Sequence, residues 1–526
     1  MKTILASLLL IVAAASSPSP AMQMIDPMTE RGHDVPCESI VLTFRMRMPT
    51  PDKMPDDARG VGLVIFDEAM THLDPATPMD EPNHDHALSI AFDVHNPQPT
   101  DLKPDEKGRV MGWFDAFGNW YDRPQREISV HANNRERLNI LSPVEYRTGA
   151  WVDVQVQIDY ILGGAHISVR LDQTTVIDQD IWDIRPIAPT AYLGVLGSGL
   201  EIADLNILRA DKVRTPIPEP VRVTVFDKQL LQNAAWLKSE AGFAGIPEQT
   251  GRVIATLTLD EPEMGYDHWD KKGTIGIKVP HDNSGTDYKV MEPERFEVFR
   301  FITPFRRGWT WHMDVTDLLP LFADERAFDA HIGTYMKGWL VSFTLDFYPG
   351  IADRTPIKVV NLWTGDAEIG NPENPTSAFY KSIAAGVPEG TTSARVRMTV
   401  TGHGMHPNSK NAGEFMPIWR TLNIRTDDPT GDVLGGDYIM QSARNHLWKT
   451  DVYLNPCRPQ GGTWKFDRSG WAPGDKVEPW CIDTQSEFVF GEQLVVEYTL
   501  DEYLNEGRGE TWAPHHWTDA QLIFYK

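Results

Sequence analysis

Three short stretches of the chain place charged side chains beside aromatic ones. They are YDHWDKKG at 266–273, TGHGMHPNSKNAGEF at 401–415 and GTWKFDRSGWAPG at 462–474. Their reactive groups are the carboxylates of Asp270 and Glu414 and the guanidinium of Arg468. A carboxylate can activate water, an arginine can stabilise an oxyanion, and aromatic walls can hold a sugar ring and exclude solvent. Together they predict hydrolysis of an amide or glycosidic bond beside a sugar.

The composition excludes several other functions. A net charge of −25 argues against nucleic acid or an anionic membrane as a partner, because both require a basic face. Seventeen tryptophans favour a protein that handles sugars. No nucleophile elbow, phosphate-binding glycine loop or Cys-x-x-Cys pair occurs in the sequence. Carboxylates therefore remain as the catalytic groups, and we expect no metal or other cofactor.

The N-terminus predicts export. Lys2 precedes an apolar run from Ile4 to Ala15, and small residues and prolines follow it up to Ala21. This is typical of a signal peptide over residues 1–21, and the run is too short for a membrane anchor. We expect a secreted or periplasmic protein that is not held at a membrane after cleavage.

The three cysteines are Cys37, Cys457 and Cys481. In an oxidising compartment we expect Cys457 and Cys481 to pair around the third stretch, which would contribute roughly 3 kcal/mol through loop entropy. Cys37 is then left as a buried thiol without a disulfide partner.

The elements that position these groups are predicted to be almost entirely strands. Residues 37–212 show short alternating segments, and in 151–171 the alternation reverses at Gly163-Gly164, which predicts a hairpin. The other predicted strands of this region are GVGLVIFD (60–67), HALSIAFDVHN (86–96), REISVHANN (126–134) and TAYLGVLGSGLEIADLNILR (190–209). Such a pattern predicts a β-sandwich, followed by a proline-rich linker at 214–223.

GVGLVIFD and FDVHN resemble the glycine-rich strand and metal loop of concanavalin A-like, L-type lectins, and the region is also similar to laminin-G sandwiches. The resemblance implies a lectin-like domain that holds a glycan or glycoprotein near the active site. The lectins bind calcium through Asp and Asn, and the matching residues here are Asp93, Asn96 and Asp122. Because Ala91 replaces the family's acidic residue, we expect polar loop residues there and no calcium site.

The second half is also rich in predicted strands. They are VIATLTLD (253–260), KGTIGIKV (272–279), FEVFRFITPF (296–305), WLVSFTLDFY (339–348), ARVRMTVTGH (394–403) and EQLVVEYTL (492–500). DVTDLLPLF at 314–322 predicts a short helix with Asp314 or Thr316 as its N-cap. PGIADRTPIKV at 349–359 is interpreted as the junction between two sandwiches.

Six motifs in the second half resemble the peptide-N-glycosidase F family, in the family's order. They are HWDK (268–271), RFITPF (300–305), DVTD (314–317), TGHG (401–404), AGEF (412–415) and WKFDRSGWAPG (464–474). The family consists of N-glycan amidases built from two jelly rolls, so the resemblance implies jelly rolls at 220–352 and 353–526. With the N-terminal sandwich, the fold class is all-β with three β-sandwich domains.

The resemblance also implies roles for individual residues. The family's catalytic Asp lies in a Trp-Asp-Arg triplet and activates the water that attacks the Asn side-chain amide. The triplet here is Trp269-Asp270-Lys271, so Asp270 is the expected base and its neighbours are expected substrate contacts. Glu414 takes the place of the family's second acid, and Arg468 that of its arginine.

His403 and Trp471 are the remaining expected contacts to substrate, because they match aromatic positions of the family. We further expect Arg468 to be held between Trp464 and Trp471, where it meets the charge of the two carboxylates or of the forming oxyanion.

The chain departs from the family at three places. Lys271 keeps the charge of the family's Arg but loses its bidentate fork. The two cysteines that flank the second acid are Ala412 and Met416 here, so no disulfide braces Glu414. The family's third acid is absent, since no carboxylate lies between His331 and Trp339, and Gly333 or Thr334 takes its place.

We interpret the chain as a secreted amidase that cleaves the bond between GlcNAc and Asn in N-glycosylated proteins or peptides. Two alternatives remain open. The lost third acid favours a glycan-binding protein with a decayed site. The histidines and methionine of HGMH (403–406) and HHW (515–517) are copper ligands by type, as in the paired-jelly-roll copper monooxygenases, but two ligand sets with sensible spacing do not emerge.

Overall fold

The structure of the chain is a computed structural model. It describes residues 21–25, 37–67, 70–71, 82–94, 126–187, 190–213, 217–280, 292–404, 413–415, 418–426, 438–444, 447–448, 457, 468–484, 486, 488–501, 504 and 514–526. The chain divides into two compact units, Met1–Glu219 and Pro220–Lys526.

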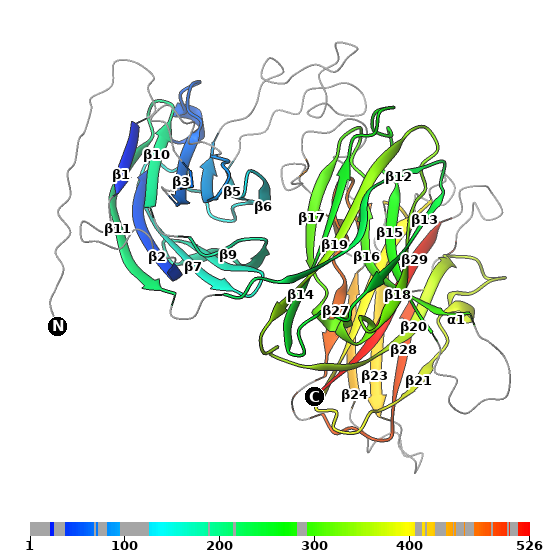
Figure 1. Cartoon of the computed structure of the whole chain (residues 1–526). Coiled ribbons are helices and arrows are strands. Elements are labelled where there is room, and N and C mark those ends of the chain that lie inside the picture. Colours follow the sequence, from blue (N-terminus) through cyan, green and yellow to red (C-terminus); the bar gives the residue numbers. More distant parts are fainter. Residues whose placement is uncertain are drawn as a thin grey trace. The chain divides into compact units, whose positions relative to one another are not determined.

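The first unit contains two antiparallel sheets (Figure 1). One sheet has the order β1 (Ala21–Ile25), β10 (Thr190–Leu196), β3 (Gly60–Phe66), β4 (Ala87–Asp93), β5 (Glu127–Ala132) and β6 (Glu136–Leu141). The other has the order β11 (Glu201–Lys212), β2 (Cys37–Arg47), β7 (Trp151–Ile161), β8 (Gly164–Leu171) and β9 (Thr174–Trp182). A short 3₁₀ helix, η1 (Pro51–Lys53), follows β2.

The predicted β7–β8 hairpin shows why this sequence forms strands. Val152 and Val154 are buried while Asp153 between them is exposed, so the period-2 alternation places one face in the core. The turn lies one residue earlier than predicted, with Gly163 at φ +82° and Gly164 already paired with Ile161. A Cβ on Gly164 would lie 2.2 Å from the Ile181 carbonyl oxygen, so only glycine fits there.

The second unit contains two sandwiches of eight main strands each. In the first, β12 (Val221–Gln232), β19 (Gly338–Pro349), β14 (Thr250–Asp260) and β17 (Trp309–Asp314) face β13 (Trp236–Gly242), β18 (Glu325–Ile332), β15 (Lys272–Val279) and β16 (Glu294–Ile302). In the second, β20 (Pro356–Glu368), β29 (His515–Tyr525), β22 (Ser393–His403) and β27 (Trp480–Asp483) face β21 (Ile383–Gly386), β28 (Gln493–Leu500), β23 (Trp419–Thr426) and β24 (Tyr438–Arg444).

Both sandwiches have jelly-roll connectivity, because the first strand pairs with the last and, apart from the β15–β16 and β23–β24 hairpins, the chain alternates between the two sheets. Each has its own buried apolar core. A two-stranded ribbon, β25 (Leu447–Trp448) with β26 (Arg468–Ser469), is added to the second jelly roll. The all-β prediction is therefore confirmed. The segment between β19 and β20 falls within the predicted junction at 349–359.

The predicted helix at 314–322 is shorter than expected and is a 3₁₀ helix, η3 (Thr316–Leu321). Its N-cap residue is Val315, which makes no side-chain cap, although the Asp314 carboxylate accepts a hydrogen bond from the Thr316 amide at 2.8 Å. Pro320 lies within it and removes a backbone donor, which is why a longer α-helix does not form. The only α-helix in the described residues is α1 (Thr376–Phe379).

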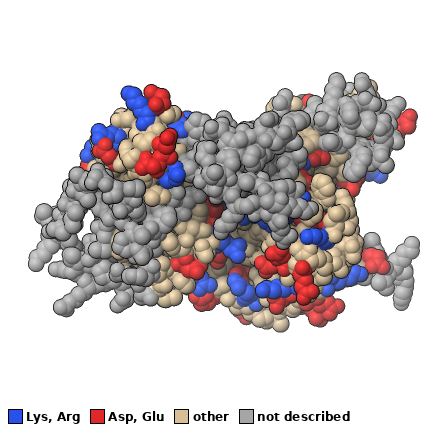
Figure 2. Space-filling model, turned by 90° about the horizontal axis from the view of Figure 1, so that it is seen from above, with Lys and Arg blue, Asp and Glu red and all other residues tan. Residues whose placement is uncertain are grey.

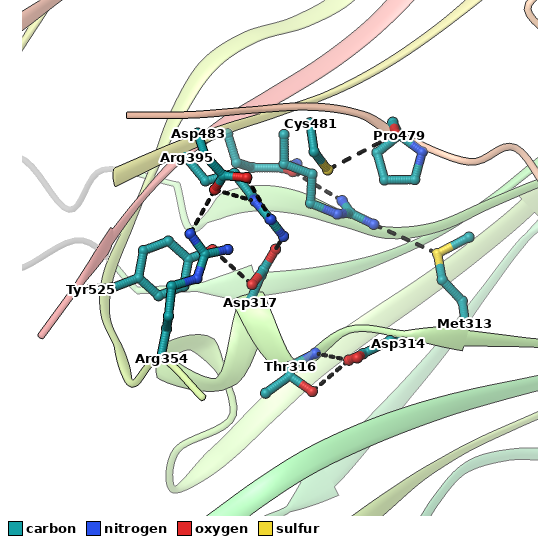
Figure 3. A network of polar contacts seen from close by, with 12 residues as sticks. Met313, Asp314, Thr316, Asp317, Arg354, Arg395, Pro479, Cys481, Asp483 and Tyr525 are labelled. Carbon is teal, nitrogen blue, oxygen red and sulfur yellow. Dashed lines mark hydrogen bonds and ion pairs between the residues drawn. The ribbon is translucent and has the colours of Figure 1, made fainter. Parts of the chain in front are cut away.

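A polar network joins η3 of the first jelly roll to the second jelly roll (Figure 3). Arg395 of β22 binds both carboxylate oxygens of Asp483, at 2.9 and 2.8 Å, and also binds Asp317 at 3.0 Å. Tyr525 donates to the other oxygen of Asp317 at 2.7 Å, and Arg354 binds Asp483 at 2.6 Å. Since these contacts connect both jelly rolls, they fix the two sandwiches against each other.

The predicted Cys457–Cys481 disulfide is wrong, because the two residues are not bonded. The Cys481 thiol lies on β27 and contacts the Pro479 carbonyl oxygen at 3.9 Å (Figure 3). The number of residues between two cysteines does not decide whether their Cβ atoms come close enough for a disulfide. Here β27 directs the Cys481 thiol to the Pro479 carbonyl oxygen. Cys37 is buried, as predicted, and burial raises the pKa of its thiol.

The predicted signal peptide at 1–21 lies outside the described residues, except that β1 begins at Ala21. None of the helices in the described part of the chain has the length and apolar character needed to cross a bilayer. On the described surface in Figure 2, basic side chains are interspersed with acidic ones.

Candidate active site

Asp270 lies in the loop between β14 and β15, two residues before β15 begins at Lys272. Thr303, which follows β16, fixes this loop from both sides. Its hydroxyl donates to the Trp269 carbonyl oxygen at 2.7 Å and accepts the Lys271 amide at 2.8 Å. Its own amide donates to the Lys271 carbonyl oxygen at 2.9 Å. The backbone on both sides of Asp270 is therefore held in one position.

Asp267 anchors the same loop to a second one. Its buried carboxylate accepts the Trp269 amide at 3.1 Å, the Met336 amide at 3.1 Å and the Lys337 amide at 3.0 Å. It also accepts the hydroxyl of Thr334. Burial opposes ionisation, but these hydrogen bonds more than compensate and lower the pKa of Asp267. Thr334, one of the two residues expected at the place of the family's third acid, thus binds Asp267.

Glu414 is held by a turn that only glycine permits. Gly413 before it has φ +90°, and a Cβ there would lie 2.5 Å from the His403 carbonyl oxygen. The Glu414 amide donates to the Gly404 carbonyl oxygen at 3.3 Å, and the Ser469 amide donates to the Glu414 carbonyl oxygen at 2.8 Å. The second acid is therefore braced by backbone hydrogen bonds, where the family has a disulfide.

Arg468 joins the two acids. Its Nη2 lies 3.1 Å from Oδ2 of Asp270, and its Nη1 bonds Oε1 of Glu414. The side chain of Arg468 is only 1% exposed, against 16% for Asp270 and 21% for Glu414. Its guanidinium carbon lies 4.4 Å from the ring centroid of Trp471 and 4.9 Å from that of Phe415. Both aromatic faces therefore cover a guanidinium that is buried behind the acids.

The segment after Arg468 is hydrogen-bonded to the first jelly roll. The Ile302 amide donates to the Asp475 carbonyl oxygen at 2.9 Å, and the Val477 amide donates to the Arg300 carbonyl oxygen at 2.9 Å. Ile302, Trp471 and Val477 form a small apolar cluster of their own. The glycines and proline of the third stretch thus let the chain run from the arginine onto β16, which aligns Arg468 with Asp270.

Burial raises the pKa of both carboxylates. For Asp270 the loss of hydration dominates, and Arg468 opposes it only in part. For Glu414 burial also dominates, Arg468 opposes it, and the neighbouring charge of Asp270 adds to the rise. Two acids that share one buried cation therefore bind protons more readily than free side chains, which suits general acid and base chemistry near neutral pH.

His403 lies behind Trp471 and not beside the acids. Its ring stacks on Trp471 at 5.4 Å between centroids, and its Nε2 is 2.8 Å from the Thr401 hydroxyl. The Trp471 indole in turn donates to the Gly402 carbonyl oxygen at 2.6 Å. Burial, followed by the nearby cation of Lys272, lowers the pKa of His403 well below its usual range. A neutral His403 thus packs against the Trp471 ring, which covers the Arg468 guanidinium.

Trp269 and Lys271 lie on either side of Asp270 at the solvent-facing rim of the site. Trp269 is 48% exposed. The Lys271 ammonium donates to the Tyr335 hydroxyl at 3.3 Å and lies 4.7 Å from the centroid of that ring. Tyr335 is itself 59% exposed. The rim therefore offers two exposed aromatic rings and one cation next to Asp270.

The structure brings together Asp270, Glu414, Arg468 and Trp471, and it places Trp269 and Lys271 beside them. Trp464, the second predicted plate, lies outside the described residues, and Phe415 covers that face of the arginine. Sequence reasoning missed Asp267, Thr303 and Tyr335. The only signal for Asp267 was its place in the same loop as Asp270, and nothing in the sequence linked Thr303 or Tyr335 to the site.

The residues considered above as calcium or copper ligands are only partly within the described residues. Asp93 ends β4, but Asn96, Asp122, Met405 and His406 lie outside them. No cluster of three or more His, Cys, Asp or Glu side chains in the described part of the chain has a metal-binding arrangement.

Two jelly rolls whose two acids share one buried arginine define the class of protein, a double-β-sandwich protein. The family model described as Peptide-N-glycosidase F, C terminal, matches residues 376–506. The chain is 26% identical over 318 residues to peptide-N(4)-(N-acetyl-beta-D-glucosaminyl)asparagine amidase F of Elizabethkingia miricola, covering 57% of this chain and 83% of that protein. The resemblance to the peptide-N-glycosidase F family, predicted from the motifs, is therefore confirmed.

Solved structures give weaker overlaps. PNGase F, a glycosylasparaginase from Flavobacterium meningosepticum, has a TM-score of 0.48 at 20% identity, covering 59% of this chain and 96% of its own. PNGF-II has a TM-score of 0.43 at 12% identity, covering 93% of this chain and 99% of its own. The jelly-roll assignment rests on the strand order of this chain.

Proposed function

We propose that the chain is an N-glycan amidase, which hydrolyses the amide bond between GlcNAc and the Asn side chain of a glycoprotein or glycopeptide. The observation that carries the proposal is the single buried arginine that binds both Asp270 and Glu414. These residues come from three distant segments, and nothing in the packing of either jelly-roll core requires them to meet. The similarity to an amidase named for this bond gives the substrate class.

In the proposed reaction, Asp270 accepts a proton from a water molecule as the water oxygen attacks the amide carbon. The tetrahedral intermediate collapses by breaking the carbon–nitrogen bond, and the leaving nitrogen takes the proton that Asp270 accepted. The products are Asp in the peptide and a glycosylamine. The raised pKa of Asp270 makes its carboxylate a stronger base than a free aspartate.

Arg468 acts as a positioning residue in this mechanism. At 1% exposure, with both terminal nitrogens bound to acids, it has no free face for the substrate oxyanion. It fixes the separation and the charge of the two carboxylates. Trp269 and Lys271 are proposed to contact the glycan or peptide at the rim.

The test is mass spectrometry of an N-glycopeptide after incubation with the protein in heavy-oxygen water. Loss of the glycan with conversion of Asn to Asp that carries the label is the expected result. Asp270→Asn should abolish the conversion, whereas Asp324→Asn, whose side chain is 90% exposed, should leave it unchanged. An intact glycopeptide after incubation at acidic and at neutral pH would refute the proposal.

One observation favours the second candidate, a glycan-binding protein without catalysis. Gly333 or Thr334 takes the place of the family's third acid, neither is a carboxylate, and the Thr334 hydroxyl is bound to Asp267. If that acid is essential, glycopeptide should bind without turnover. Titration of the protein with intact glycopeptide, monitored by calorimetry, separates the two, because a binder gives a stable complex with unaltered ligand.

A further inference from the structure

A group of polar side chains lies inside the second jelly roll, between its two sheets. Arg420 and Tyr498 come from β23 and β28 of one sheet, while His516 and Thr518 come from β29 of the facing sheet (Figure 1). His516 and Thr518 are fully buried, and Arg420 is 6% exposed. A jelly-roll core is normally apolar at such positions, so this group needs a physical explanation.

The cation of Arg420 has no carboxylate partner among the described residues. Its guanidinium lies 4.2 Å from the centroid of the Trp480 ring and contacts the Tyr498 hydroxyl, and its Nε makes no hydrogen bond. An aromatic face and a phenol offset only part of the cost of removing a guanidinium from water.

His516 has the same deficit. Neither ring nitrogen has a hydrogen-bond partner within the described part of the structure, although the side chain is fully buried. The Tyr380 hydroxyl nearby is already paired with Thr518 at 2.7 Å. Burial and the charge of Arg420 lower the pKa of His516 to about 3, so the ring is neutral and presents one N–H donor.

We propose that Arg420 and His516 bind a small inorganic anion of the halide type. The available groups are a guanidinium and an imidazole N–H, and an anion would accept from both while neutralising the buried charge. Water could satisfy the hydrogen bonds but not the charge. A singly charged halide is favoured over sulfate or phosphate, because the cost of burying an ion rises steeply with its charge.

The position of the anion would place it beneath the loop of Glu414. His516 pairs in register with Gly402 of β22, and a Cβ on Gly402 would lie 1.9 Å from the Gly413 carbonyl oxygen. The halide would stabilise this end of the jelly roll.

Thermal unfolding of the full chain in sodium bromide and in sodium gluconate, at equal ionic strength, tests the proposal. We expect a saturable rise in Tm of ~3 °C or more with bromide, since a ligand that binds only the folded state stabilises it. Arg420→Met should abolish the rise. Arg425→Met, on the same strand but paired with Glu497 at 3.5 Å on a partly exposed side chain, should retain it.

Bromide-soaked crystals of the unmodified protein provide a second test that does not depend on a variant folding. An anomalous peak between the Arg420 guanidinium and the His516 ring is expected. Equal Tm in the two salts, an equal bromide effect in Arg420→Met, or anomalous peaks only at surface positions would overturn the proposal, the last indicating an adventitious ion only.

Discussion

Replacing Arg468 is the most informative perturbation, because this side chain is bound to both acids and is almost fully buried. In Arg468→Ala the cation and its two contacts are lost, and Asp270 and Glu414 are left near each other without a counter-charge. The variant separates two roles of the residue, since stability and catalysis should respond to different extents.

The structure gives the expected size of the loss in stability and of the loss in activity. Removing one partner of a buried ion pair costs about 3–5 kcal/mol when the other must stay charged. Here both acids are partly exposed and can take up protons, so we expect a loss of about 2–3 kcal/mol in the free energy of unfolding. This is less than the ~5–15 kcal/mol of a typical domain, so the fold should persist. Activity should fall by about 10²-fold, because Asp270 is no longer held in position.

The pH profile gives a signature that a purely structural role would not produce. Arg468 lowers the pKa of Asp270 and of Glu414, against burial, which raises both. Without the arginine both pKa values rise further, so the acidic limb of kcat/KM should move to higher pH. Raising the pH should therefore recover part of the lost activity in Arg468→Ala.

The assay is label incorporation into a glycopeptide across pH 4–9, with circular dichroism and thermal unfolding on the same samples. Arg468→Lys is the matched control for charge, and about one-tenth of the native rate is expected because an ammonium cannot fork between two carboxylates. Near-normal turnover in Arg468→Ala, or an unmoved acidic limb, would refute the assigned role.

Four further predictions follow from other residues of the structure and from Asp270 itself. Asp270→Asn should lose turnover, yet its Tm at pH 7 should be no lower than that of the native protein. Because the pKa of Asp270 is raised in the folded state, the native protein loses stability as the pH rises above the unfolded value of 3.8. The advantage of the variant in Tm should therefore shrink towards pH 4. Lys272→Met should be more stable than the native protein mainly below pH 7. Burial lowers the pKa of Lys272 from 10.5 to about 7, so the native protein recovers stability as the pH rises between these two values. Thermal unfolding of both proteins at pH 6 and pH 10 checks this. Arg395→Met should lower the free energy of unfolding by about 2–3 kcal/mol, measured in urea, by breaking the network of Figure 3. Alkylation of the denatured protein without reductant should label both Cys457 and Cys481, and a cross-linked peptide that contains the two would contradict the structure.

The extent of prediction differs between the strands and the site. Alternation in 151–171 and in KGTIGIKV gave strands within a residue or two of β7, β8 and β15, because a half-buried strand must alternate. The disulfide failed for the opposite reason, since the spacing between Cys457 and Cys481 says nothing about the direction of their Cβ atoms.

The sequence by itself determined the class of the fold, and it predicted the jelly-roll half of the molecule and the two acids with their arginine, because these depend on local pattern and on motifs in a fixed order. Only the tertiary structure decided that Arg468 binds both acids from behind, that Asp267 anchors two loops and that Thr334 is directed into this anchor. These contacts connect residues more than fifty positions apart. Their geometry depends on how β16 receives the segment after Arg468, which no local pattern encodes.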